Sequence, residues 1–138
     1  MSEHEKWAAR WRALIKTAAW WFFWPAVAVI VWGELRPVQD DDGLPYWDKL
    51  LHFTAYFGLA WLATLAWGRR IPALLILAVV LALGGVLEIL QGLVGRDGEW
   101  LDMLANGLGG LAGMLLALLM LYIARVVDAR LVGKRRGD

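Results

Sequence analysis

The sequence predicts an all-helical membrane protein, built as a bundle of four membrane-spanning helices. Hydrophobic residues make up 60% of the 138 residues, a larger share than an ordinary soluble domain contains. The apolar residues also fall into four runs of about 17–24 residues, and a helix of that length crosses one bilayer. No stretch shows the alternation of apolar and polar residues that predicts a half-buried strand.

The first half of the chain contains two of the four spans. Residues 1–15 are basic and carry two tryptophans four residues apart, which is typical of an amphipathic helix at a membrane interface. The first span covers residues 16–33. Residues 34–46 contain proline, glycine and three consecutive aspartates, so we expect a solvated loop there. The second span covers residues 50–67.

The second half of the chain contains the other two spans and a tail. The third span covers residues 71–94, beginning close to a proline that the first turn of a helix tolerates. The fourth span covers residues 103–124. Residues 125–138 form a basic tail, so the predicted membrane domain is residues 16–124.

Basic residues predict the direction of the spans. Of the 14 lysines and arginines, most lie in the N-terminal segment, in the loop between the second and third spans, and in the tail. Because basic loops stay on the cytoplasmic side, we expect both termini inside, in a multi-pass protein of the cytoplasmic (inner) membrane. In the tail, Asp128 is expected to form a solvated pair with Arg125.

Polar residues gather near the predicted outer ends of the second, third and fourth spans. Most of them stand three or four residues apart along one span, so they share one helix face, and Arg96 lies in the loop between the third and fourth spans. The set comprises Asp48, Lys49, His52, Tyr56, Glu88, Gln91, Arg96, Asp102 and Asn106. Ionisable groups inside a membrane are costly and are expected to pair with one another. Glu88 lies about one to two helical turns inside the predicted outer boundary, and His52 and Arg96 are its expected partners.

Small residues recur every four positions on the fourth span. Ala105, Gly109 and Gly113 form a stripe that allows another helix backbone to approach closely. We expect Gly84 and Gly85 of the third span to form the opposing surface. Such close packing would hold Asn106 against the polar ends of the neighbouring spans.

Three blocks of the sequence resemble the VanZ-like family. They are "DKLLHFTAYFGLA", "EILQ" and "GRDGEWLDMLANGLGGLAG", and together they cover about residues 46–117. The resemblance implies a small multi-helix integral membrane protein. The founding member of that family is associated with low-level resistance to the glycopeptide teicoplanin, and the family supplies no settled biochemical mechanism to carry over to these residues.

The sequence allows four interpretations of the polar cluster. It could be a structural network that fixes helix register, or a binding site for a membrane lipid or lipid-linked cell-envelope precursor. It could also be an enzyme site, with Glu88 and His52 as an acid–base pair, or a proton relay for transport. An outward-facing site beneath an acidic surface favours a zwitterionic or amide-rich headgroup over a bare phosphate.

The composition excludes cysteine chemistry and gives no indication of a metal or cofactor site. The chain has no cysteine, so disulfides, cysteine metal sites and thiol nucleophiles are impossible. The only serine is Ser2, far from the cluster. We expect no bound metal, no cofactor and no nucleic-acid partner, and the sequence does not predict an oligomeric state.

Overall fold

A computed structural model of the chain describes residues 3–36, 46–93 and 99–133. These residues form four helices and, at residues 68–72, the short turn between the second and the third of them. The helices are α1 (Glu3–Leu35), α2 (Trp47–Trp67), α3 (Ala73–Leu93) and α4 (Trp100–Gly133). All four are long and apolar enough to cross a membrane, so the described part of the chain is the helical membrane bundle that the sequence predicts.

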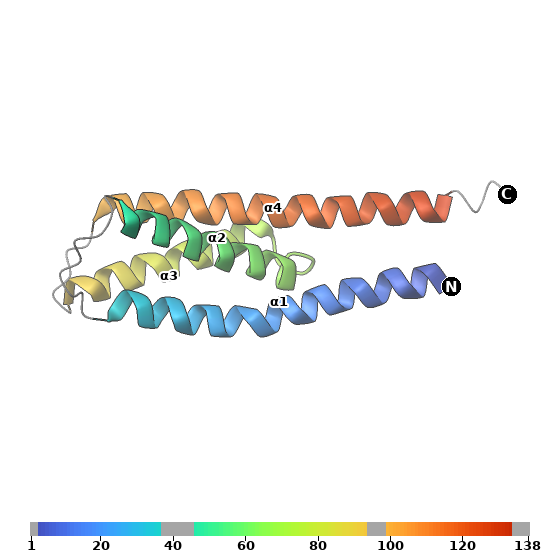
Figure 1. The fold of residues 1–138 in the computed structure, drawn as a ribbon. Helices are drawn as coiled ribbons and strands as arrows, with labels where there is room; N and C mark the ends of the chain where they lie inside the picture. The colour runs from blue at the N-terminus through green and yellow to red at the C-terminus, as the bar shows by residue number, and fades with distance from the viewer. Residues whose placement is uncertain (1–2, 37–45, 94–98, 134–138) are drawn as a thin grey trace.

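The helices differ in length, and this difference gives the bundle two distinct ends. At 1.5 Å per residue, the 33 residues of α1 and the 34 of α4 extend about 50 Å, whereas the 21-residue α2 and α3 extend about 32 Å. Figure 1 shows α1 and α4 projecting beyond the α2–α3 pair. We call the end with these projections the terminal end. The opposite end, where α2 and α4 begin, is the polar end.

Several boundaries differ from those that the sequence predicts, and one of them is the end of α4, which runs to Gly133 where the fourth span was expected to end at residue 124. The basic N-terminal segment is the first part of α1, and the helix continues without a break into the predicted span. At the other end, α1 runs through Glu34 to Leu35, so the expectation of a loop beginning at residue 34 was wrong by two residues. Pro25 lies inside α1, as membrane helices allow.

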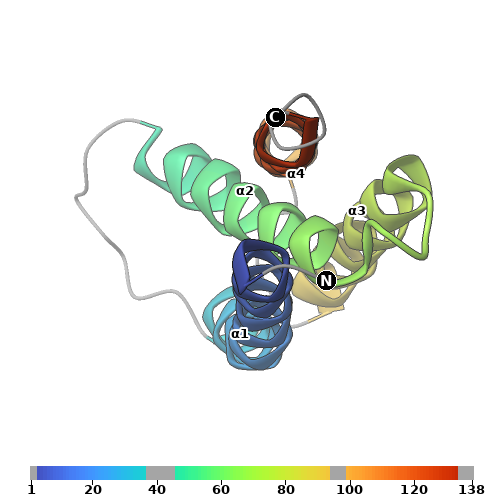
Figure 2. The ribbon, with the colours of Figure 1, turned by 90° about the vertical axis from the view of Figure 1, so that its right-hand side faces the viewer.

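The α2 helix is central to the packing of the bundle. It packs most extensively against α4 and next most against α1, and in both ribbon views it lies between them (Figure 2). A Cβ atom on Gly109 or Gly113 of α4 would overlap the carbonyl oxygen of Phe53 or Phe57 of α2. The small-residue stripe of α4 therefore faces α2, and our expectation that it would face α3 was wrong.

The α3 helix uses a glycine of its own against α2. A Cβ atom at Gly84 would lie 2.9 Å from the ring of Tyr56, whereas one at Gly85 would meet nothing within 4 Å. Gly84 thus makes room for the tyrosine ring, while Gly85 takes no part in this contact.

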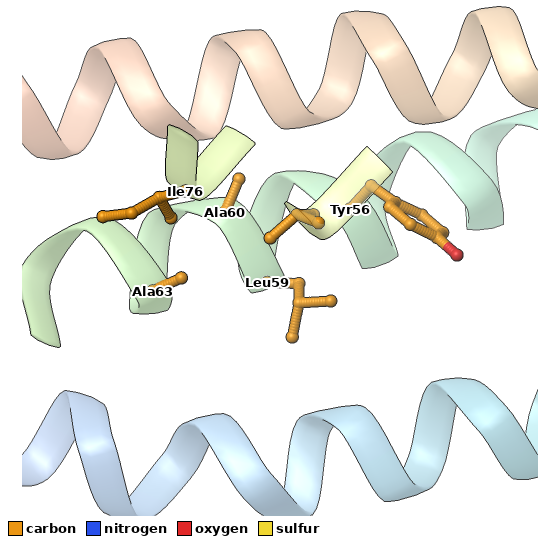
Figure 3. Packing of buried hydrophobic residues seen from close by; sticks show 6 residues of the cluster. Tyr56, Leu59, Ala60, Ala63 and Ile76 are labelled. Atoms are coloured by element: carbon orange, nitrogen blue, oxygen red, sulfur yellow. The ribbon is translucent and has the colours of Figure 1, made fainter. Parts of the chain in front are cut away.

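The apolar core lies along α2 below the polar end. It contains Tyr56, Leu59, Ala60 and Ala63 of α2, together with Ile76 and Val80 of α3. Figure 3 shows Leu59 directed toward α1 and the hydroxyl of Tyr56 directed away from the other labelled side chains, toward the polar end. The core residue nearest the polar cluster is therefore also the one that carries a polar group.

At the terminal end, the projecting parts of α1 and α4 are joined by an ion pair. The guanidinium of Arg12 contacts the carboxylate of Asp128, so the expected pairing of Asp128 with Arg125 gives way to one between two helices. Trp7 and Trp11 on the same part of α1 pack edge to face, with ring centroids 5.5 Å apart. Helix pairing thus continues beyond the ends of α2 and α3.

Candidate functional site

All four helices contribute to one polar cluster at the polar end. The helices α1 and α3 finish there, and α2 and α4 begin there. Six polar or charged residues are buried in the described parts of the chain, and five of them belong to this end: Glu34, His52, Gln91, Asp102 and Asn106. Burial of so many polar groups at one end of an otherwise apolar bundle marks this region as the candidate site.

Lys49 lies at the surface edge of the cluster and binds three carboxylates. Its Nζ atom is 2.6 Å from Asp48, 2.6 Å from Glu99 and 2.8 Å from Asp102. The side chains of Asp48 and Glu99 are about half exposed, at 55% and 53%, whereas that of Asp102 is only 8% exposed. The ammonium therefore stands between water and the buried part of the site, and it ties the start of α2 to the start of α4.

His52 occupies the centre of the buried part. Its Nδ1 atom lies 3.2 Å from Asn106 Oδ1 and 3.7 Å from Glu34 Oε1. Its Nε2 atom lies 3.9 Å from Asp102 Oδ1. One imidazole thus faces an amide and two carboxyl groups from α1 and α4, and its protonation would make it an ion-pair partner for both carboxylates.

A second layer of polar groups lies around the α1 and α3 ends. The side-chain amide of Gln91 donates to the backbone carbonyl of Glu34 at 3.1 Å. The hydroxyl of Tyr56 is completely buried and lies within electrostatic range of the Glu34 and Glu88 carboxyl groups. Figure 3 agrees, because it shows this hydroxyl directed toward the polar end.

Glu88 contributes a carboxyl group whose hydrogen bonding is incomplete. Both of its oxygens are shielded from solvent, and neither has a hydrogen-bond partner among the described residues. The group interacts electrostatically with Asp102, His52 and Lys49, and the backbone N–H of Glu99 approaches it without meeting hydrogen-bond geometry. Glu88 therefore faces the cluster and offers two acceptor atoms to it.

The structure brings together eight of the nine residues that the sequence assigned to the cluster. The ninth, Arg96, lies outside the described residues, so its expected pairing with Glu88 stays a prediction. Of the small residues on α4, Gly109 and Gly113 contact the α2 backbone, while Ala105 is half-buried one turn before Gly109. The hydroxyl of Thr54 donates to the Leu50 carbonyl of its own helix at 2.7 Å, so it is not directed into the site.

Comparison with known families identifies the chain through nearly its whole length. The VanZ/LLP1 family matches residues 4–121, which include every described helix at least in part. The chain belongs to the VanZ/LLP1 family. Neither curated proteins nor solved structures give a significant match. The matched region contains the whole cluster, so the site lies within the VanZ/LLP1 part of the chain.

The VanZ/LLP1 site contains one residue that sequence reasoning missed. Glu34 was placed in a solvated loop because the first apolar run ends at Gly33. The helix continues for two more residues, which places the Glu34 carboxyl group 3.7 Å from His52. Its position in the sequence could have revealed it, because Glu34 follows the first span at the predicted outer boundary, where Asp48 and Asp102 also lie.

Three carboxylates of this VanZ/LLP1 protein are spaced as metal ligands would be. Oxygen atoms of Asp48, Glu99 and Asp102 all lie within 4.8 Å of one another, and carboxylate oxygens suit hard cations such as Ca²⁺. The Lys49 ammonium contacts all three and supplies positive charge where an ion would. The arrangement is therefore suited to bind cations and hydrogen-bond donors.

Proposed function

We propose that this VanZ/LLP1 protein binds the polar headgroup of a membrane lipid or lipid-linked envelope precursor at its polar end. In this proposal the protein lies in the bacterial cytoplasmic membrane with the polar end facing outward. The observation that carries the proposal is Glu88, whose two shielded oxygens have no hydrogen-bond partner among the described residues. A buried carboxyl group inside a membrane protein is costly unless it is paired, and a ligand's donor groups would complete it.

The surroundings of the cluster suit a ligand with both a polar and an apolar part. The cluster lies at one end of four helices that are long and apolar enough to cross a membrane, and the proposal places this end at the level of the lipid headgroups. Large apolar side chains are exposed on α2, α3 and α4 near the same end, among them Leu50, Leu51, Ile89 and Met103. Acyl or isoprenoid chains would pack against these side chains while the headgroup contacts the buried polar groups.

A structural role is the second candidate, and the Lys49 and His52 contacts favour it. Lys49 joins α2 to α4 through Asp102, and His52 joins them through Asn106. Hydrogen bonds between membrane helices contribute about 1 kcal/mol each or less. These contacts account for Lys49, His52 and Asn106, but they leave the Glu88 oxygens without a donor.

Photo-crosslinking would separate the two functions. The full chain would be incorporated into vesicles that contain diazirine-bearing phosphatidylethanolamine and phosphatidylglycerol, and lipid adducts would be mapped by mass spectrometry. We expect adducts on α2 and α4 near the polar end, and we expect Glu88→Gln to reduce them. Glu3→Gln, at the exposed start of α1, is the matched control. Unchanged adducts in a folded Glu88→Gln protein would contradict the binding proposal and favour the structural role.

A further inference from the structure

The geometry around Lys49 indicates what kind of chemical group the cluster accepts. Three carboxylates from two helix starts and the residue before α4 surround one ammonium at 2.6–2.8 Å. These are the short distances of charge-assisted hydrogen bonds. A primary ammonium has three N–H donors, so one ammonium can donate to each of the three carboxylates.

The carboxylates continue from the surface into the bundle. Asp48 and Glu99 form a half-exposed rim, and the buried Asp102 lies at the floor between them. Asp102 interacts electrostatically with Glu88, whose oxygens are shielded and have no hydrogen-bond partner among the described residues. The Lys49 ammonium thus contacts three of these four carboxyl groups and interacts electrostatically with the fourth, Glu88.

We infer that the group recognised here is a primary ammonium on a zwitterionic headgroup, and that Lys49 takes its place when no ligand is bound. This inference rests on the proposed function. A ligand ammonium would enter past the exposed rim, contact Asp102 and approach Glu88. The long Lys49 side chain would then move outward, where it would pair with the phosphate of the same headgroup.

Other headgroups fit this set of side chains less well. A bare phosphate would meet four carboxyl groups, and its negative charge would be repelled by them. A quaternary ammonium has no N–H donor for the carboxylates and is better bound by aromatic faces. A phosphate ester of ethanolamine supplies both the three donors for the carboxylates and the anion for the displaced Lys49.

The test compares phospholipids whose headgroups differ in whether they carry a primary ammonium. The full chain would be reconstituted in nanodiscs containing phosphatidylethanolamine, N-acetylated phosphatidylethanolamine, phosphatidylcholine or phosphatidylglycerol, and bound lipid would be measured by native mass spectrometry. We expect retention of phosphatidylethanolamine above the other three. We expect Lys49→Met to increase that retention about tenfold, because it removes a competing ammonium tethered at high effective concentration. The pairing of the displaced Lys49 with the phosphate would be exposed to water, so its loss costs less than this gain.

Several outcomes would overturn the inference. If all four lipids were retained equally and Glu88→Gln abolished this retention, the binding proposal would stand, but recognition of a primary ammonium would be rejected. Weaker phosphatidylethanolamine binding by a folded Lys49→Met protein would show that Lys49 attracts the ligand instead of competing with it. If lipid retention did not depend on Glu88, both the binding proposal and the ammonium inference would be rejected. If Lys49→Met does not fold, Asp48→Asn is tested in its place. We expect Asp48→Asn to bind phosphatidylethanolamine severalfold more weakly. Unchanged binding would contradict the inference.

Discussion

His52 of α2 meets Asn106 of α4 beside one of the close approaches of the two helix backbones. The His52 Nδ1 and Asn106 Oδ1 atoms are 3.2 Å apart, and the next residue of α2, Phe53, presents its carbonyl to Gly109 of α4. Because Asn106 and Gly109 are three residues apart, they share one face of α4. The glycine contact thus sets the distance at which the buried polar pair forms.

Replacing Gly109 with alanine should separate α2 from α4 and weaken the bundle. The new Cβ atom would overlap the Phe53 carbonyl, and overpacking of this kind costs about 1–3 kcal/mol. We expect a lower thermal unfolding midpoint in detergent micelles. Gly107→Ala is the matched control, since a Cβ there would meet nothing within 4 Å. Equal midpoints for the two variants would show that the close approach does not limit stability.

The polar pair itself should contribute a measurable coupling energy. A double-mutant cycle with His52→Ala and Asn106→Ala isolates the interaction between the two side chains. We expect a coupling of about 1 kcal/mol, the range found for hydrogen bonds between membrane helices. The cycle would be measured by reversible unfolding in mixed micelles. A coupling of zero would mean that the two groups are held by other partners and not by each other.

The sequence alone predicts the α2 and α3 helices and most of the cluster, for a clear physical reason. Asp48, His52 and Tyr56 stand four residues apart, and helical periodicity then requires one shared face. Polar residues inside a membrane helix also avoid lipid, which predicts that the faces of several helices turn toward one another. Both arguments use spacing within a single helix, where sequence determines geometry directly.

What the sequence does not predict depends on which helices become neighbours. Gly84 and Gly109 look equivalent as sequence, yet Gly84 packs on a tyrosine ring and Gly109 on a backbone carbonyl. The Arg12–Asp128 pair likewise joins residues more than a hundred positions apart. Glu34 was missed because hydropathy does not distinguish the last turn of a helix from the loop that follows. These contacts depend on tertiary packing, which spacing within one helix does not define.

Cross-linking should confirm that α1 and α4 converge at the terminal end. The chain has no cysteine, so cysteines placed by Arg12→Cys and Asp128→Cys would be the only thiols. We expect efficient bridging of this pair by a short bifunctional maleimide, because the native side chains contact each other. The combination of Arg10→Cys with Asp128→Cys is the control, since Arg10 is exposed and neighbouring in sequence. Equal bridging of both pairs would indicate that the projecting parts of α1 and α4 do not hold Arg12 and Asp128 in a fixed contact.

Reporter fusions should show which side of the membrane the polar end faces. The predicted orientation places both termini in the cytoplasm, and the polar end is opposite the terminal end (Figure 1). We expect a periplasmic phosphatase inserted at Asp41 to be active and the same enzyme fused after Asp138 to be inactive. The reverse pattern would place the polar end inside the cell, and the proposed headgroup would then belong to the inner leaflet.

Replacing Lys49 with methionine should convert the ammonium site into a cation site. The substitution keeps an unbranched side chain but removes the charge that now lies among Asp48, Glu99 and Asp102. Because these three carboxylates already have oxygen atoms within 4.8 Å of one another, they would attract a hard cation such as Ca²⁺ or its luminescent substitute Tb³⁺. Trp47, next to Asp48 in sequence, would serve as the sensitiser.

We expect Tb³⁺ luminescence from Lys49→Met that Ca²⁺ displaces, and a much weaker signal from the unmodified protein. The double variant Lys49→Met with Asp102→Asn is the control, because it removes the one buried ligand of the three. An equal signal from the unmodified protein would mean that the cation enters beside Lys49 and that the ammonium does not occupy the position. No signal from either protein, with both folded, would mean that the three carboxylates depend on Lys49 for their arrangement.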